Sequence, residues 1–482
     1  MRRTALVLAV TFAIGGCMLG PDYKRAAIDA PTTFRFEDKA ARDLANTDWW
    51  EQFRDPVMDD LIRIALAENK DVKIAAARVE EYLGRYGVSR SELFPQVGAN
   101  ANASRNRASA AAVPVPLPGS IDPKYTNIQA SVYASWEIDV WGKIRRLNEA
   151  ARADLLATEE GRRATILTLV ASVAASYINL RDLDEQLEIA KSTAASRGES
   201  AKVFQQRFKG GVVSEMQLAQ AQSEYESALA SVPQIQIQIA QQESALSVLL
   251  GRNPGAIKRG RAITQFDALA VPAGLPSELL ERRPDLRQAE QNLIAANARI
   301  GAAKALYFPT ISLTALAGGV STQLSNLFSG ANRAWSYGGD ATMPIFTAGR
   351  TAGVVQQAEA LQQQALLQYE KSIQNAFREV EDALVSLQKS REQFSAQGRQ
   401  IGALRTYARL ARLRYDNGYT SYLEVVDAET RLFNAELSYT QTQGTVIISL
   451  VNLYKSMGGG WVVNAERLTA VQPAGKSMAG AR

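Results

Sequence analysis

The chain contains an internal duplication. Residues 207–214 read RFKGGVVS, and residues 414–421, 207 positions later, read RYDNGYTS. Residues 93–97 match 307–311 at an offset of 214, so the first copy carries seven extra residues between these motifs. A period near 200 residues is far longer than that of solenoids or propellers, so each copy must be a supersecondary assembly that need not fold alone. We therefore expect the function to depend on what the two copies build together.

The first residues have the pattern of an export signal. Two arginines follow Met1, an apolar run extends from Ala5 to Gly16, and Cys17 comes next. A membrane anchor is the alternative, but twelve helical residues reach only about 18 Å across a hydrocarbon core about 30 Å thick. The sequence therefore predicts a signal peptide at 1–16, which is removed.

The residues at the end of this signal predict a lipid anchor. Ile14-Gly15-Gly16-Cys17 resembles the lipobox of bacterial lipoproteins, in which the cysteine becomes the lipidated first residue. Cys17 is the only cysteine, which excludes an internal disulfide. The residue after the cysteine is Met18 and not the aspartate that usually retains such lipoproteins at the inner membrane, which resembles the pattern of outer-membrane sorting. We expect 17–60 to form a lipid-anchored N-terminal segment.

Composition argues against enzymatic and metal chemistry. The chain has no histidine and one cysteine, so the commonest general base and the usual transition-metal ligands are missing. A Gly-rich phosphate loop with its lysine is also missing, which argues against nucleotide hydrolysis. The 54 basic and 49 acidic residues are scattered, which gives little support to nucleic-acid binding. We expect no enzyme activity, no nucleic-acid partner, and no cofactor beyond the lipid.

Each copy contains a pattern typical of a long helical hairpin. Proline is missing from 144–209 and from the matching 351–416, and apolar residues recur there at three- and four-residue spacings. Each stretch would be about 95 Å long as an unbroken helix. A Gly-containing tip follows, at about 207–214 and 414–421, and then a returning helical pattern at 214–250 and 420–455. Pro233 predicts a kink or a break in the first returning helix.

Each copy also contains a pair of strand-like segments, at about 95–140 and 310–345. Apolar and polar residues alternate in all four segments, and no later stretch has 18 consecutive apolar residues. Ten-residue alternating segments are typical of transmembrane barrels, although a soluble hairpin sheet has the same pattern. Aromatic residues near the segment ends favour the membrane: Tyr125, Trp136, Trp141, Trp335 and Tyr337.

Four strands cannot close a membrane barrel, because the smallest barrels have about eight. Several chains must therefore share one barrel, and two chains would supply eight strands and three would supply twelve. Geometry alone leaves both open. The predicted domain order is a first repeat at 61–255, a linker at 256–281, a second repeat at 282–461 and a polar tail at 462–482.

Several motifs together resemble one family, the outer-membrane factor lipoproteins of resistance-nodulation-division efflux systems (NodT type). They are CMLGPDYK at 17–24, LLERRPDLRQAE at 279–290, AANA at 295–298, FPTISL at 308–313 and VNLYK at 451–455. The resemblance implies an α+β homotrimer, with a twelve-stranded outer-membrane β-barrel continuous with a periplasmic α-helical tunnel. It also implies a periplasmic adaptor and an inner-membrane pump as partners, and a passive exit duct for drugs or other small molecules.

The resemblance also implies roles for residues at the hairpin tips. The periplasmic gate would comprise Leu423 as an apolar constriction, Glu424 and Asp427 as acidic rings, and Tyr415. Carboxylates at i and i+3 share a helix face, and symmetric copies around a narrow axis attract cations and repel each other unless they are paired. An ordinary solvated helix face is the alternative. The adaptor-docking tips would be Gly211, Val212, Val213, Ser214, Gly418, Tyr419, Thr420 and Ser421, which can also be simple turns.

The chain departs from the family at one latch. Thr420 replaces an arginine that ties the gate in a relative, and Met216 and Gln217 stand at the positions of its partners, so that latch is not expected here. Two other functions stay open from the sequence. One is a metal-ion duct of the same architecture, and the other is a structural envelope-spanning lipoprotein without a pore.

Overall fold

The computed structural model describes residues 18–25, 34, 48–107, 124–266, 279–458 and 462. The predicted signal peptide 1–16, Cys17 and residues 463–482 of the predicted tail lie outside this range. The described elements, in chain order, are η1 (Trp49–Phe53), α2 (Pro56–Glu68), α3 (Lys70–Ser91), β1 (Gln96–Arg107), β2 (Lys124–Ile138), α4 (Lys143–Lys209), α5 (Glu215–Leu249), η3 (Ile263–Gln265), α6 (Leu279–Arg282), α7 (Pro284–Ala305), β3 (Thr310–Ser321), η5 (Leu324–Asn326), η6 (Gly330–Asn332), β4 (Arg333–Thr342), α8 (Arg350–Asp416) and α9 (Tyr422–Ser456).

The two halves of the chain repeat the same helical hairpin. Helices α4 and α8 have 67 residues each, and α5 and α9 have 35 each. Both pairs are related by the offset of 207 residues that the sequence motifs have. Helix α5 continues through Pro233, so the break that the proline allowed does not occur there.

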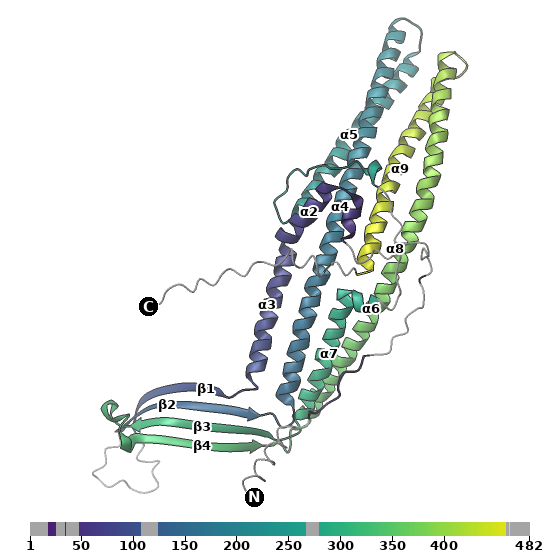
Figure 1. Ribbon diagram of the computed structural model, residues 1–482. Coiled ribbons are helices and arrows are strands. Elements are labelled where there is room, and N and C mark those ends of the chain that lie inside the picture. The colour runs from purple at the N-terminus through teal and green to yellow at the C-terminus, as the bar shows by residue number, and fades with distance from the viewer. Residues whose placement is uncertain are drawn as a thin grey trace. The chain divides into compact units, whose positions relative to one another are not determined.

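The four strands form one antiparallel sheet in the order β1-β2-β3-β4 (Figure 1). Its register places the apolar residues of all four strands on one face, because directly paired residues share a face. One such row across the sheet is Ala99, Val132, Ala317 and Trp335. The row beside it on the opposite face is Asn100, Ser131, Gly318 and Ala334. The alternation seen in the sequence therefore produces a single two-faced sheet.

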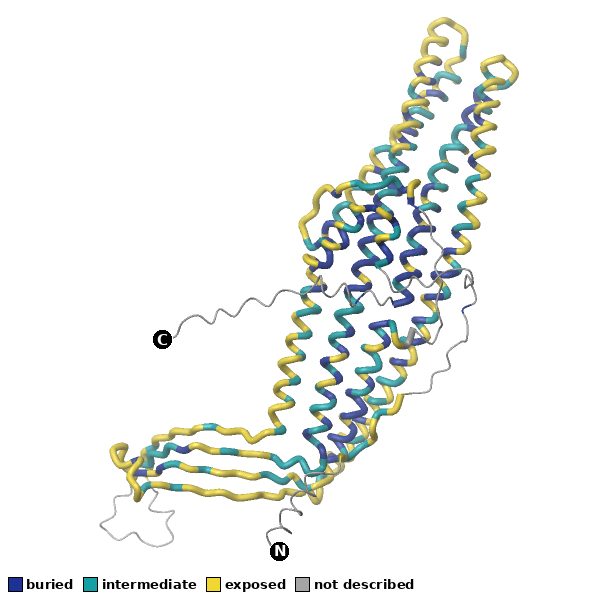
Figure 2. Tube along the Cα trace, in the orientation of Figure 1, coloured by how far each residue is buried: buried dark blue, intermediate teal, exposed yellow. Residues whose placement is uncertain are grey.

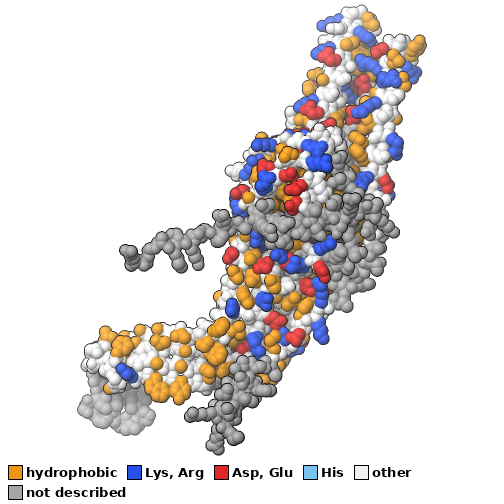
Figure 3. Space-filling model, viewed as in Figure 1, with side chains coloured by type: hydrophobic (Ala, Val, Ile, Leu, Met, Phe, Trp, Pro, Cys, Tyr) orange, Lys and Arg blue, Asp and Glu red, His pale blue; other side chains and the backbone are white. Residues whose placement is uncertain are grey.

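The apolar face of this sheet is exposed within the chain. Val97, Trp335 and Tyr337 have exposed fractions of 71%, 72% and 79%. Figure 2 shows exposed and intermediate residues along most of the four strands, and Figure 3 shows hydrophobic side chains gathered over them. An apolar face of this extent requires an apolar surrounding, because large exposed patches mark interaction or membrane surfaces.

Two of the aromatic residues expected near the strand ends lie near the two ends of β2, but neither is on the apolar face of the sheet. Trp141 lies past β2, where its indole N–H donates to the Pro309 carbonyl at 2.9 Å and its ring packs against Phe308. Tyr125 is paired with Asn106, which places it on the polar face. The period-two pattern could have assigned Tyr125 to that face, whereas the contact of Trp141 depends on a distant segment.

The chain divides into two compact units, each built from several segments. The first unit comprises 1–27, 79–158 and 289–369 and holds the sheet with the adjoining parts of α3, α4, α7 and α8. The N-terminal segment of this unit is held by the buried Arg146, which donates to the Leu19 carbonyl at 3.0 Å and to Asp22 at 2.8 Å. Small residues such as Ala150 and Ala295 let α4 and α7 pack closely.

The second unit comprises 28–78, 159–288 and 370–482 and contains the main hydrophobic core. In Figure 2 its buried residues concentrate where α2, α4 and α9 meet. Asp55 is fully buried there, and it accepts hydrogen bonds from the backbone of Val57, the hydroxyl of Tyr177 and the backbone of Arg261. A buried carboxylate with this many donors stabilises the start of α2 and orients the segment around residue 260.

Within the described residues, α4 passes a length and composition test for membrane helices. Ile166, Val170, Val173 and Ile178 on this helix are almost fully buried in the core of the second unit. A core helix of a protein satisfies the same test, so its apolar character is explained by packing.

Candidate functional site

Both hairpin tips of the second unit have the same backbone geometry. Gly211 has a φ of 72° and Gly418 a φ of 77°. At the first tip the N–H of Gly211 donates to Phe208 and that of Val212 to Arg207; at the second, Gly418 donates to Tyr415 and Tyr419 to Arg414. This is the Schellman arrangement, which needs a left-handed residue just after the helix and strongly favours glycine there.

The two returning helices begin differently. Ser214 caps α5 in a reciprocal capping box with Gln217. Ser421 precedes α9 without a side-chain capping bond, and Thr420 instead donates its hydroxyl to the carboxylate of Glu424. The first tip is therefore closed by a local cap, whereas the second directs its polar side chain to one of the predicted gate residues.

The exposed residues of the tips are apolar as well as polar. Val212, Met216 and Tyr419 have exposed fractions of 73%, 75% and 78%. Val213 instead packs partly against a small core at this end of the hairpins. Each tip thus presents at least one large apolar side chain to the surroundings, which a turn that only joins two helices does not need.

That small core contains a cluster of three aromatic rings. Phe204 of α4 lies 4.2 Å from Tyr422 and 6.0 Å from Tyr415, measured between ring centroids, and the two tyrosines lie 5.3 Å apart. Burial raises the pKa of Tyr422 to about 12, and the neighbouring Glu429 adds to the increase. Tyr415, predicted as a gate residue, therefore packs between the two hairpins rather than standing free.

The remaining predicted gate residues lie on the first turns of α9. Leu423 is 62% exposed, although it is a large apolar residue on a helix. Glu424 lies beside it, with Arg414 Nη1 at 3.0 Å from its Oε1. Asp427 follows one turn later, where it accepts from Arg431 Nε at 2.9 Å and from the Tyr407 hydroxyl at 3.4 Å. Glu424 and Asp427, three residues apart, share one face of α9, as the sequence implied, and Leu423 lies on the same turn.

Neither acidic residue had a predicted partner. Arg431 could have been found, because an arginine four residues after an aspartate on a helix is a standard ion pair. Arg414 gave no such signal, because the pair with Glu424 forms across the tip between two helices. Within each chain the structure therefore places an arginine beside each of the two acidic residues, and the acidic rings stay a prediction.

A second polar group ties the hairpins together further along α9. Arg197 of α4 is 7% exposed, and it donates to the Glu224 carboxylate of α5 at 2.7 Å and to the Thr430 hydroxyl of α9 at 3.0 Å. A buried guanidinium with this geometry fixes α9 against the first hairpin, because breaking one contact leaves a buried charge without its partner. The sequence analysis did not identify Arg197, and no local spacing points to it.

The chain was compared with known proteins. A family model described as "Outer membrane efflux protein" matches residues 61–252 and 275–459. The chain belongs to this family. It is 36% identical over 471 residues to the antibiotic efflux pump outer membrane protein ArpC of Pseudomonas putida, covering 96% of each chain. It is 35% identical over 462 residues to the cation efflux system protein CusC of Escherichia coli, covering 95% of this chain and 98% of the relative.

A solved structure of the same kind is similar over most of the length. The open state of the Neisseria gonorrhoeae MtrE outer membrane channel aligns with a TM-score of 0.82 at 31% identity, covering 92% of this chain and 98% of that one. The predicted family and the predicted α+β class are therefore confirmed, and the protein is an outer membrane efflux protein with the fold of a channel. The gate residues and docking tips stay predictions.

Proposed function

We propose that three copies of this chain form the exit duct of a tripartite efflux system in the outer membrane. The sheet described above carries the proposal. It has one exposed apolar face, one largely polar face, and two outer strands, β1 and β4, each of which pairs on one side only among the described residues. Three such sheets joined edge to edge would make a twelve-stranded barrel whose apolar face meets lipid and whose polar face lines a pore.

The helical part supports a tunnel that continues from this barrel into the periplasm. Its long hairpins end in tips with exposed apolar residues, which fits docking of a periplasmic adaptor linked to an inner-membrane pump. We place the docking contacts at Val212 and Tyr419 and their tip neighbours. Cys17 would carry the lipid that anchors the mature N-terminus to the outer membrane.

We place the gate at Leu423, Glu424 and Asp427. Leu423 is apolar and exposed on the first turn of α9, so that three copies around an axis would form an apolar constriction. Glu424 and Asp427, each with its arginine partner, follow Leu423 on α9 and would set which ions pass. Tyr415, in contact with Phe204 and Tyr422, would hold this end of α9 against the first hairpin.

Organic small molecules are the proposed cargo, and metal ions are the alternative from the sequence. Within the described part of the chain, no group of three or more histidine, cysteine, aspartate or glutamate side chains is placed to hold a metal ion. The relatives carry both kinds of name, antibiotic efflux for ArpC and cation efflux for CusC. This breadth fits a duct whose cargo is selected by the pump.

Single-channel conductance in planar bilayers tests the proposal. The purified mature protein should give a low conductance that rises in Leu423→Ala, because the variant removes the apolar constriction. Leu229→Ala is the matched control, since Leu229 is also partly exposed but lies on α5 away from the proposed gate. If neither wild type nor Leu423→Ala conducts, the duct is wrong and the structural lipoprotein is favoured. Equal conductance in all three proteins would show that Leu423 does not form the gate.

A further inference from the structure

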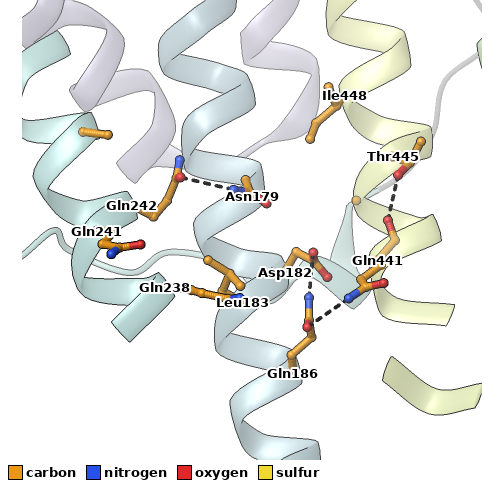
Figure 4. Close-up of a pocket in the computed structure, with 12 residues that line it drawn as sticks. Asn179, Asp182, Leu183, Gln186, Gln238, Gln241, Gln242, Gln441, Thr445 and Ile448 are labelled. Atoms are coloured by element: carbon orange, nitrogen blue, oxygen red, sulfur yellow. Dashed lines mark hydrogen bonds between the residues drawn. The ribbon is translucent and has the colours of Figure 1, made fainter. Parts of the chain in front are cut away.

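The second unit contains a pocket that the proposed gate does not use. It lies between α4, α5 and α9 and has a volume of about 620 Å³ (Figure 4). Pockets of this size can hold a small organic molecule. Its lining includes six asparagine and glutamine side chains from the three helices but only one ionisable side chain, Asp182.

Asp182 is an unusual residue for this position. It is 6% exposed, and its Oδ1 atom has no hydrogen-bond partner within the part of the chain that the structure describes. The other oxygen, Oδ2, accepts from Gln186 Nε2 at 3.0 Å. Leaving a buried carboxylate oxygen without a donor is unfavourable, because the ion has lost its water without a full replacement. The pocket therefore has a negative charge with unused capacity to accept hydrogen bonds.

Hydrogen bonds among the neighbouring amides leave the amide oxygen of Asn179 free to accept. Gln441 of α9 donates to Gln186 at 3.3 Å, and this bond directs the Gln186 amide toward Asp182. On the other side, Asn179 donates to Gln242 at 3.2 Å, and Gln242 donates to the Ser176 carbonyl at 2.8 Å. These bonds use amide N–H groups as donors, and among the described residues no donor is bonded to the side-chain oxygen of Asn179. In Figure 4 Gln242 and Asn179 lie together on one side of the pocket, and Asp182 and Gln186 lie together further along α4.

One carboxylate among neutral amide oxygens selects a particular ligand chemistry. An anion is repelled by Asp182, and a divalent metal ion prefers several carboxylates or histidines, which this lining lacks. A primary ammonium group fits, because it carries one positive charge and three N–H donors. The pair would be a charge-assisted hydrogen bond, which is stronger than a neutral one.

We propose that this pocket binds the primary ammonium group of a small organic cation, with Asp182 as its counter-ion and the oxygen of Asn179 as a second acceptor. Because Oδ1 is covered, the ammonium reaches the carboxylate from the pocket side, where the broad terminal torsion of an aspartate lets its oxygens turn. Gly444 on α9 faces Asp182, and because glycine has no side chain, α9 can approach this carboxylate closely. The inference rests on the proposed duct, to which it adds one class of cargo.

Equilibrium binding of spermidine by the full-length mature protein tests the proposal. Isothermal titration calorimetry at pH 7.5 should show saturable binding to the wild type and at least a tenfold loss of affinity in Asp182→Asn, which keeps the shape and removes the charge. Asp60→Asn is the matched control, because Asp60 is an exposed aspartate of α2 outside the pocket, and it should bind as the wild type does. Asn179→Leu, a second variant, should weaken binding without a change in charge.

A pH series gives an independent readout. Burial, more than the neighbouring Glu185, raises the pKa of Asp182 to about 6, and neither α5 nor α9 contributes another ionisable group to the lining. Spermidine affinity should therefore fall by roughly tenfold between pH 7.5 and pH 5, because the carboxylate becomes protonated. Asp182→Asn should lose this dependence.

The outcomes separate this inference from the proposed duct. Wild-type binding that is missing, or that Asp182→Asn leaves unchanged, overturns the pocket proposal. Conductance in the bilayer experiment without spermidine binding would contradict the pocket alone, and binding without conductance would contradict the duct alone.

Discussion

The guanidinium of Arg414 lies 3.0 Å from the carboxylate of Glu424, and the two residues stand on opposite sides of the tip that joins α8 to α9. Asp427 and Arg431 form a second pair at 2.9 Å on α9. Neutralised carboxylates repel their symmetry copies less than free ones, so these pairs reduce the repulsion that the sequence alone suggested. The side chains of both pairs are exposed or partly exposed to solvent, so the pairs add little to stability.

Removing both acidic side chains should change which ions pass. In Glu424→Ala with Asp427→Ala, Arg414 and Arg431 lose their partners and leave positive charge beside the proposed constriction. We expect the preference for potassium over chloride to fall, measured as the reversal potential across a bilayer with a KCl gradient.

The control for this experiment is Glu188→Ala with Glu199→Ala. These residues are exposed on α4, and each is paired with a lysine of its own helix, so the variant changes the net charge by the same amount away from the gate. If the gate variant and the wild type have the same reversal potential, the assignment of Glu424 and Asp427 is wrong.

Two glycines of α8 and its tip should respond to alanine in opposite directions. Gly418 has a φ of 77°, a conformation that costs a residue with a Cβ roughly 1–2 kcal/mol, so Gly418→Ala should lower the apparent melting temperature. Gly402 lies within α8 with open space around it, and alanine there should stabilise the helix by up to about 1 kcal/mol. A stabilised Gly418→Ala would exclude the Schellman turn at this tip.

Local patterns in the sequence were sufficient for the elements and for the two faces of the sheet. The absence of proline over 66 residues and the repeated seam required a long helix, and strict alternation required strands such as β2. The same patterns could not give the register. That register depends on pairs such as Trp136 with Leu313, which are far apart in the chain.

The site was predictable only as far as its residues share one helix. The family resemblance implied Leu423, Glu424 and Asp427, and helical spacing added that the two carboxylates share a face. Arg197 and the pocket around Asp182 combine side chains from α4, α5 and α9, and no spacing within one element contains that information. In the sequence Asp182 is indistinguishable from an ordinary exposed residue of a helix, because its burial depends on α9.

The proposed lipid anchor depends on the thiol of Cys17. Cells given labelled palmitate should incorporate the label into the wild type, and Cys17→Ala should lose it, because no other cysteine can accept the acyl chain. Met18→Ala is the control, since it changes the neighbouring residue and keeps the thiol. Label in Cys17→Ala at the wild-type level would show that the anchor is attached elsewhere.

Asp59 of α2 offers a test of stability against pH. Burial, with smaller contributions from Glu51 and Asp55, raises the pKa of this carboxyl from 3.8 to about 6. The folded protein therefore holds a proton that the unfolded chain releases between about pH 4 and pH 6, and stability decreases as the pH rises through this window. At pH 7.5 Asp59→Asn should raise the apparent melting temperature by a few degrees, and most of the gain should be lost near pH 4, where the folded carboxyl is protonated and the unfolded one is close to its midpoint of titration. Asp60→Asn, an exposed neighbour paired with Arg63, should change little at either pH. A gain for Asp59→Asn that is the same at pH 4 and pH 7.5 would mean that shape, and not charge, is responsible.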